Sequence, residues 1–406
     1  MIDPRDFGID NLPLGIVADD AGRARPAVAY RDLVVDLDAL VHARAIDEQS
    51  LADASSLNAF LGRGPAAWTA LRARLQHLLG ERASAEERRA VAAASHPHGA
   101  LHARMPVQVG DYVDFYSSLE HATSLGRILR PGGEPLPPNY RHIPIGYHGR
   151  SGTVVISETP IRRPAGQTKA GDAAAPEFGP SQMLDVELEM GWIAGPGNAL
   201  GAPIPADAVR EHVYGYVLLN DWSARDIQGW EYQPLGPFLS KSFATSISPW
   251  IVSLEALEPF RVAEPPREPE PLRYLRASQP FAYDVELDLL LLTRAMAERG
   301  DPPFHVSRTN LRGMYWTVAQ QLAHVTANGA TIRPGDLFGT GTISGFEPGT
   351  QGSLIERTWR GRDPLALPGG ETRAFLENGD TAIVRGRAVR GDLRIGFGEV
   401  VGTIVA

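Results

Sequence analysis

Acidic side chains occupy alternate positions in the segment LDVELEM, residues 184–190. Successive side chains of a β-strand point to opposite faces, so Asp185, Glu187 and Glu189 would line one face, about 6.6 Å apart in successive pairs. Like charges placed in this way repel and raise one another's pKa. The pattern fits a solvated outer face of a sheet, and it also fits a site where Glu187 and Glu189 share a divalent cation.

Two further carboxylates stand among apolar or aromatic residues. Asp114 lies in the segment GDYVDFY, and Asp221 ends the apolar run LLND. A carboxylate at the end of a buried strand needs a partner, because burying an unpaired charge is costly. If these two meet Glu187 and Glu189, the four form an all-oxygen site. Such a site selects a hard cation, Ca²⁺ or Mg²⁺, over zinc or copper.

Polar residues also interrupt the apolar segment that follows Asp221. Arg225 and Gln228 are three positions apart and would share one side of a helical turn, and Lys241 stands between apolar neighbours. Each of these residues taken singly is equally consistent with an ordinary surface ion pair.

Histidine is the side chain best suited to act as a general base near neutral pH. His121 lies close to Asp114 in the sequence, and His148 is the rival candidate. The chain contains 11 histidines, so spacing alone does not choose among them.

Composition narrows the class of protein. The 406 residues include no cysteine, which excludes a cysteine nucleophile, a disulfide scaffold and a zinc–thiolate site. A net charge of −9 argues against a broad nucleic-acid-binding face. The sequence shows neither a signal-peptide pattern nor the roughly 18 apolar residues in a row that a membrane helix needs, so we expect a cytoplasmic protein with no membrane partner.

The elements that must position these residues fall into two parts. Residues 1–105 predict a small domain with a hairpin over residues 27–40. Two helices follow, one with Pro65 as its first helical residue, and one with a capping-box pattern formed by Ser84 and Glu87. We expect the domain boundary near residue 105.

The remaining residues, 106–406, predict a strand-rich domain. Alternating or apolar runs mark strands over residues 184–190, 213–220, 250–254, 283–293, 381–389 and 399–405. Helical spacing runs from 311 to 325, and residues 166–181 read as an exposed loop. Strands and helices do not alternate, so the expected fold is mainly β with some α, not a doubly wound parallel sheet.

Several longer segments carry a family resemblance. The segments GDYVDFYSSLEHAT, LPPNYRHIPIGYHGR, LDVELEM, LNDWSARDIQGWEYQPLGPFLSKSF and GDLFGTGTISG resemble the fumarylacetoacetate hydrolase family, and the similarity extends to NLPLGI near the N-terminus. The resemblance implies a small SH3-like N-terminal barrel, a mixed β-roll and a homodimer. It also implies metal-dependent hydrolysis of the C–C bond of 4-fumarylacetoacetate to fumarate and acetoacetate, the last step of tyrosine and phenylalanine catabolism.

The resemblance also implies a role for each candidate residue. The Ca²⁺ or Mg²⁺ ligands are Asp114, Glu187, Glu189 and Asp221, and Asp221, Lys241 and Thr245 lie beside a second, magnesium-like position. His121 would be the general base, oriented by Glu356, while Arg225, Gln228 and Lys241 would stabilise the oxyanion. The substrate contacts would be Tyr116, Arg130, Tyr147, Gln228, Tyr232 and Thr342.

Two alternatives remain open from the sequence. The chain would fit a related diketo-acid hydrolase or decarboxylase, such as a fumarylpyruvate or acylpyruvate hydrolase, although Tyr116, Arg130 and Tyr147 favour fumarylacetoacetate. It would also fit a protein that binds metal and a diacid without catalysis.

Overall fold

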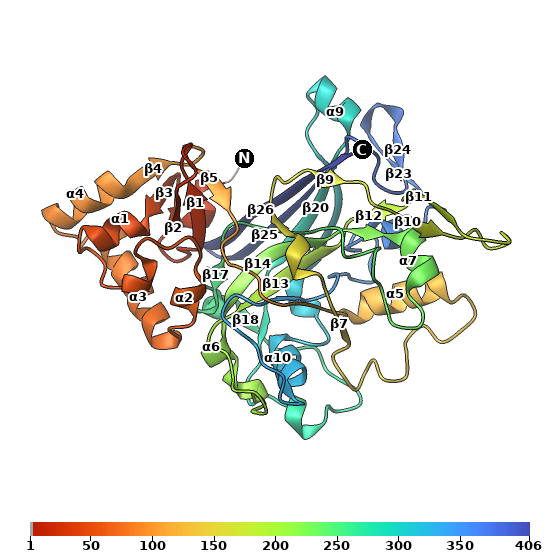
Figure 1. Ribbon diagram of the computed structural model, residues 1–406, viewed down its shortest axis with the longest axis horizontal. Coiled ribbons are helices and arrows are strands. Elements are labelled where there is room, and N and C mark those ends of the chain that lie inside the picture. The colour runs from red at the N-terminus through yellow and green to blue at the C-terminus, as the bar shows by residue number, and fades with distance from the viewer. Residues whose placement is uncertain (1–2) are drawn as a thin grey trace.

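The computed structural model describes residues 3–406, which form a mainly β structure with some helices (Figure 1). The N-terminal part contains a five-stranded sheet in the order β4-β3-β2-β1-β5. Its strands are β1 (Leu14–Ala18), β2 (Ala24–Tyr30), β3 (Leu33–Asp36), β4 (Ser95–Pro97) and β5 (His102–Arg104). Its helices are α1 (Leu37–His42), α2 (Asn58–Leu61), α3 (Pro65–Leu79) and α4 (Ala85–Ala94).

The largest sheet is curled and positions the candidate site. Its order is β7-β6-β22-β13-β14-β16-β8, and β17 pairs with β14 beside it. The strands are β6 (Tyr112–Phe115), β7 (Gly146–His148), β8 (Val154–Ile156), β13 (Leu188–Ala194), β14 (Val213–Asp221), β16 (Thr245–Ile247), β17 (Val252–Ser253) and β22 (Leu337–Gly339).

Another five-stranded sheet packs against this eight-stranded sheet through β25 and β26, which lie against β14. Its order is β21-β20-β25-β26-β9, with β9 (Ile161–Arg162), β20 (Glu286–Leu292), β21 (Phe304–Asn310), β25 (Thr381–Arg390) and β26 (Leu393–Val405). Four two-stranded pairs complete the β structure: β10 (Ala165–Thr168) with β11 (Glu177–Pro180), β12 (Leu184–Asp185) with β15 (Ser223–Ala224), β18 (Arg261–Val262) with β19 (Ala282–Tyr283), and β23 (Leu365–Ala366) with β24 (Thr372–Arg373).

The central strand β14 explains how the parts are joined. All nine of its residues are buried. Leu218 belongs to the core between the two large sheets, whereas Val217 and Leu219 belong to the core that the eight-stranded sheet shares with the N-terminal part. A strand covered on both faces loses the apolar–polar alternation, so β14 reads as a continuous apolar run. Asp221 is the charged residue at its end.

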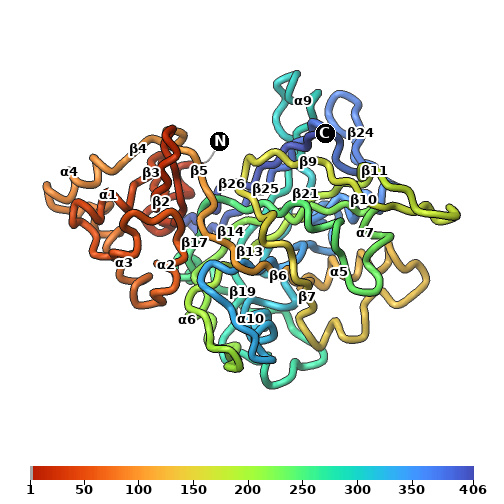
Figure 2. The backbone as a smooth tube through the Cα atoms, viewed as in Figure 1, coloured from red at the N-terminus to blue at the C-terminus, as the bar shows by residue number. Residues whose placement is uncertain are grey.

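The remaining helices are short and lie around the sheets (Figures 1 and 2). They are α5 (Leu119–Leu129), α6 (Val209–His212), α7 (Arg225–Glu231), α8 (Leu254–Leu257), α9 (Arg294–Arg299), α10 (Val318–Thr326) and α11 (Leu354–Arg357). In both figures the hairpin β10–β11 projects at the right, beside α7.

The structure differs from the sequence-based expectation in several elements. Residues 37–40 of the expected hairpin belong to α1, and the strand expected over 283–293 is divided between β19 and β20. Residues 184–190 do not form one strand, because β12 pairs with β15 whereas β13 pairs with β14 and β22. Residues 166–181 form the hairpin β10–β11 and not an irregular loop. The helix expected over 311–325 begins only at Val318, where Thr317 and Gln320 form a capping box.

Candidate active site and metal centre

Four buried carboxylates meet at one end of the eight-stranded sheet. Asp114 lies on β6, Glu189 on β13 and Asp221 at the end of β14, while Glu187 lies between β12 and β13. Their ligand atoms lie within 4.8 Å of one another, and at most 4% of any of the four residues is exposed. The structure therefore brings together all four residues that the sequence suggested. The two glutamates lie in this buried cluster and not on a solvated outer face.

The neighbouring strand β22 makes room for this cluster. Gly339 pairs with Asp114 on one side, and a Cβ atom at Gly339 would lie 2.6 Å from Asp114 Oδ1 and 3.1 Å from Glu189 Oε2. Two residues further on, the backbone N–H of Gly341 donates to Glu189 Oε2 at 2.9 Å and to Asp114 Oδ1 at 3.2 Å. The absence of side chains at Gly339 and Gly341 thus lets the two carboxylates approach a shared backbone donor.

Neutral hydroxyl groups bind the other side of the cluster. Tyr147 Oη donates to Asp221 Oδ2 at 2.6 Å and lies 3.2 Å from Asp114 Oδ2. Thr245 Oγ1 donates to Asp221 Oδ1 at 2.7 Å. Thr245 reaches this position because β16 pairs with β14 and sets it opposite Asp221.

Two buried cations partly balance the charge. Lys241 Nζ bonds Glu187 Oε2 and lies 2.8 Å from Asp221 Oδ2, and Arg225 Nη2 donates to Glu187 Oε1 at 2.7 Å. Burial alone would raise the pKa of Glu187, but the charges of Lys241 and Arg225 bring that pKa well below its ordinary value.

In the other half of the cluster, Asp114 and Glu189, the charge of Lys241 only partly offsets the effects of burial and neighbouring carboxylates. Burial, together with the neighbouring Asp221 carboxylate, raises the pKa of Asp114 well above its ordinary value. Burial and the Asp114 carboxylate do the same to the pKa of Glu189. Glu189 Oε1 is buried without a hydrogen-bond partner. An unpartnered buried oxygen within a group of four carboxylates is the donor set that a hard divalent cation fits.

A histidine–carboxylate pair faces the same cavity. His121, on α5, lies with Nδ1 2.6 Å from Glu356 Oε2 on α11, and both side chains are buried. Ser344 Oγ and Ser353 Oγ also donate to Glu356 Oε2, at 2.9 and 2.7 Å. Burial would raise the pKa of Glu356, but His121 and these hydroxyls bring it below its ordinary value. Because an ionised carboxylate only accepts hydrogen bonds, a bond between this pair requires a proton on Nδ1. His121 Nε2 is thereby left to accept a proton.

A cavity of about 430 Å³ joins these groups. It is lined by His121, Asp114, Glu187, Arg225 and Lys241, and by all six candidate substrate contacts, Tyr116, Arg130, Tyr147, Gln228, Tyr232 and Thr342. The rings of Tyr116 and His121 meet edge to face, with centroids 5.4 Å apart. Thr342 Oγ1 is buried without a partner, and Arg130 lies exposed with Nη2 2.7 Å from the carbonyl oxygen of Pro135.

Other residues of the site carry no clear signal in the sequence. The sequence does not distinguish Ser344, Ser353 or the cavity-lining Arg360, because an isolated serine or arginine resembles many surface residues. Asp185 does not join the carboxylate cluster, because the change of strand partner after β12 turns its side chain toward Arg225 and α11. His148, the rival histidine, is exposed on β7 and does not line the cavity.

Comparison with known proteins identifies the family of the chain. The profile described as fumarylacetoacetate (FAA) hydrolase C-terminal matches residues 112–405, and the profile described as fumarylacetoacetase N-terminal matches residues 10–121. The chain belongs to the fumarylacetoacetate hydrolase family.

Within this family, the chain is similar over nearly its full length to several fumarylacetoacetases. The fumarylacetoacetases of Rattus norvegicus, Homo sapiens and Arabidopsis thaliana are each 44% identical to this chain, over 98% of its length and 96% of theirs.

Solved structures of lower identity share the fold. A fumarylacetoacetate hydrolase from Exiguobacterium antarcticum has a TM-score of 0.54 and 17% identity, covering 97% of this chain and 99% of that chain. A maleylpyruvate hydrolase from Sphingobium has a TM-score of 0.51 and 15% identity, covering 96% and 99%.

None of the helices within residues 3–406 has the length and apolar character needed to cross a bilayer.

Substitution of Gly341 tests how the backbone supports the carboxylates. Gly341 has a φ of +78°, and a Cβ atom there would lie 2.1 Å from the carbonyl oxygen of Phe115. Gly341→Ala should therefore displace the N–H that binds Glu189 and Asp114, and Ca²⁺ affinity measured by calorimetry should fall at least tenfold. Gly349→Ala is the control, because Gly349 has a φ of +82° with open space around it. Equal Ca²⁺ affinities in the two variants would contradict this role for Gly341.

Proposed function

We propose that this protein is a fumarylacetoacetase, which hydrolyses 4-fumarylacetoacetate to fumarate and acetoacetate. The observation that supports this best is the meeting, in one cavity, of four carboxylates, a His–Glu pair and two buried cations. The 44% identity to curated fumarylacetoacetases over 98% of the chain supports the choice of substrate.

The reaction needs an activated water molecule. In the proposed mechanism, His121 Nε2 takes a proton from water while Glu356 holds the proton on Nδ1 and stabilises the imidazolium that forms. The water oxygen bonds to the ketone carbon of the fumaryl group, which becomes the new carboxylate carbon of fumarate. The C–C bond to the acetoacetyl carbon then breaks, its electron pair leaves with that carbon, and His121 returns the proton there.

The tetrahedral alkoxide needs donors aimed at it. Arg225 Nη1 lies 3.1 Å from Gln228 Oε1, which turns the amide nitrogen of Gln228 away from Arg225 and leaves it free to donate. Lys241 supplies a second donor from the cavity wall. A single donor of this kind can contribute about 3–4 kcal/mol to catalysis.

The donor set also fits a resident cation. Asp114, Glu187, Glu189 and Asp221 would hold Ca²⁺ or Mg²⁺, and Asp221, Lys241 and Thr245 would flank a second, magnesium-like position. A bound divalent cation supplies Lewis-acid stabilisation to the enolate that leaves. Tyr116, Arg130, Tyr147, Tyr232 and Thr342 would bind the rest of the substrate, with Arg130 pairing with a carboxylate.

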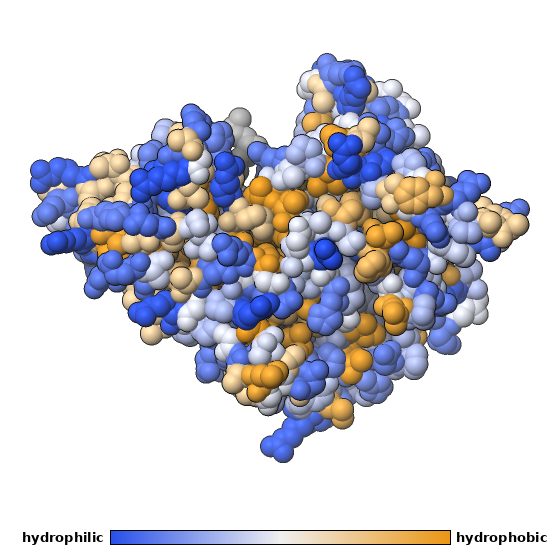
Figure 3. Space-filling view, in the orientation of Figure 1, coloured by the Kyte–Doolittle hydropathy of each residue, from blue (hydrophilic) through white to orange (hydrophobic). Residues whose placement is uncertain are grey.

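The proposal extends to assembly and location, as the family resemblance implies. We expect a cytoplasmic homodimer, each chain with an SH3-like unit over residues 1–105 and a catalytic β-roll over residues 106–406. Large apolar side chains exposed near the cavity support an interface, since Leu235 is 95% and Phe238 70% exposed. Figure 3 shows apolar side chains on this face, including the region of α7. Analytical ultracentrifugation measures the mass of the assembly.

Replacement of His121 tests the mechanism. Metal-loaded wild-type protein should release fumarate from fumarylacetoacetate, and His121→Ala should lower kcat by about 10²–10⁴, the range expected for loss of a general base. Ca²⁺ affinity should stay within about threefold, because His121 does not bond to the cluster. The control is His148→Ala, which should keep full activity. A wild-type protein that folds and binds metal but releases no fumarate would refute the proposed function.

Replacement of Glu189 tests the cation site separately from catalysis. A ligand at 100 times its Kd stabilises the folded state by about 2.7 kcal/mol, and wild-type protein should show such a gain with Ca²⁺ in thermal unfolding. Glu189→Gln should lose most of this gain.

The pH dependence of the metal-free protein follows from the same residue. The pKa of Glu189 is raised in the folded state, so this carboxyl group lowers stability as pH rises through that pKa, and Glu189→Gln should remove this loss.

Asp53→Asn is the control for the Ca²⁺ effect, because Asp53 belongs to a separate, largely exposed group with Asp38 and His42. An unchanged Ca²⁺ effect in Glu189→Gln, or its loss in Asp53→Asn, would place the cation elsewhere.

A further inference from the structure

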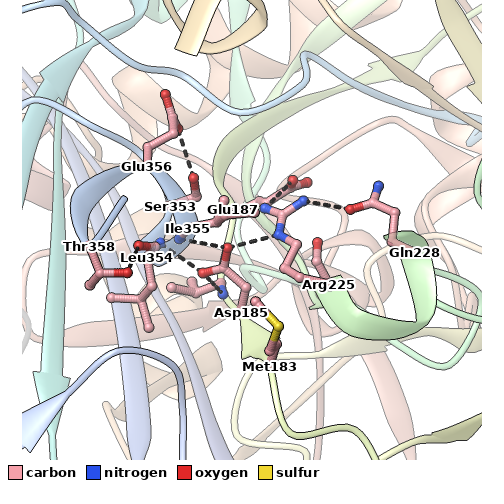
Figure 4. A network of polar contacts seen from close by, with 12 residues as sticks. Met183, Asp185, Glu187, Arg225, Gln228, Ser353, Leu354, Ile355, Glu356 and Thr358 are labelled. Atoms are coloured by element: carbon pink, nitrogen blue, oxygen red, sulfur yellow. Dashed lines mark hydrogen bonds and ion pairs between the residues drawn. The ribbon is translucent and has the colours of Figure 1, made fainter. Parts of the chain in front are cut away.

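Asp185 is a buried carboxylate that the proposed mechanism does not use. Its side chain is fully buried on β12, and it accepts four hydrogen bonds (Figure 4). Oδ1 accepts from the backbone N–H groups of Leu354 at 2.7 Å and Val186 at 2.8 Å. Oδ2 accepts from the N–H of Ile355 at 3.1 Å and from Arg225 Nε at 2.8 Å. Asp185 thus joins two segments that are distant in the sequence.

The first of these segments carries Glu356, the carboxylate that orients the base His121. Leu354 and Ile355 are the first two residues of α11, whose next residue is Glu356. Ser353 stands at the N-cap but forms no side-chain cap with the helix backbone, and instead donates its hydroxyl to Glu356. The N–H groups that begin a helix need acceptors, and Asp185 supplies them from another strand.

The second segment carries the donors for the oxyanion. Arg225 begins α7, and its guanidinium reaches Asp185 through Nε, Glu187 through Nη2 and Gln228 through Nη1. Figure 4 shows Asp185 between Arg225 on one side and the start of α11 on the other. Asp185 therefore accepts one hydrogen bond from Arg225, which belongs to the proposed oxyanion donors, and two from the start of the helix that carries Glu356.

We propose that Asp185 is a positioning residue that sets the distance between the His121–Glu356 base and the Arg225–Gln228 donors. The proposal rests on the proposed function. A water molecule held by the base and a carbonyl held by the donors must meet in reacting geometry, and a misplacement of about 1 Å can cost about 100-fold in rate. Asp185 is a single carboxylate that bonds directly to both segments.

Asp185→Asn tests the proposal. Asparagine has one acceptor oxygen, so its NH₂ group must face Arg225 Nε or the N–H groups of α11, and one link breaks. We expect kcat to fall about 100-fold while KM for fumarylacetoacetate and Kd for Ca²⁺ each change less than about threefold. Asp185→Glu, which keeps the charge but displaces it, should give the same split between kcat and KM, and it replaces Asp185→Asn if that variant does not fold.

Asp380→Asn is the matched control. Asp380 is also buried and binds an arginine and a backbone N–H, through Arg373 Nε at 2.9 Å and the N–H of Glu377 at 2.9 Å, but it does not line the cavity. It should lose thermal stability as Asp185→Asn does, with kcat unchanged.

Two further readouts separate positioning from general destabilisation. In a His121→Ala background, Asp185→Asn should reduce the residual kcat less than about threefold, because there is no base left to misplace. In wild-type protein, the Nδ1–H proton of His121 should give a downfield NMR signal that is absent from His121→Ala, lost or shifted in Asp185→Asn and kept in Asp380→Asn.

Three results would overturn the inference: a kcat within threefold of wild type in Asp185→Asn, the same fold loss with and without His121, or an unchanged His121 signal. If wild-type protein releases no fumarate, the proposed function fails, and the NMR comparison still decides whether Asp185 positions His121.

Discussion

Burial of four carboxylates within 4.8 Å of one another is the constraint on which the site depends. Lys241 and Arg225 compensate Glu187, but Asp114 and Glu189 face each other with one buried oxygen unpartnered. Such an arrangement is unfavourable unless a cation or protons complete it. The sheet supplies the rigidity that keeps these groups together, because three of the four carboxylates lie on β6, β13 and β14.

The same groups link charge compensation to the proposed chemistry. Glu187 accepts bonds from both Lys241 and Arg225, so the residues that balance the cluster also line the cavity where the oxyanion would form. The base stands apart, on α5 and α11, and does not bond to the cluster. Because of this separation, loss of the metal and loss of the base should be separable in experiments, whereas Asp185 bonds to both the Glu356 helix and Arg225.

Much of the fold class and of the candidate site could be predicted from the sequence. The acidic residues in LDVELEM and at Asp221 indicated an oxygen-rich site, and the family resemblance supplied His121 and Glu356. Residue spacing could not predict the role of Asp185, because a break after β12 reverses the face that simple alternation assigns to it. It also could not predict Gly339 and Gly341, whose importance depends on strands that pair across more than 200 residues.

Anomalous diffraction from crystals of the protein grown with Mn²⁺ would locate the cation site, since Mn²⁺ is a divalent ion that prefers oxygen ligands. We expect a strong anomalous peak between Asp114, Glu187, Glu189 and Asp221, facing the cavity that His121 lines. A structure with that position empty, and the peak instead at Asp38, His42 and Asp53, would contradict it.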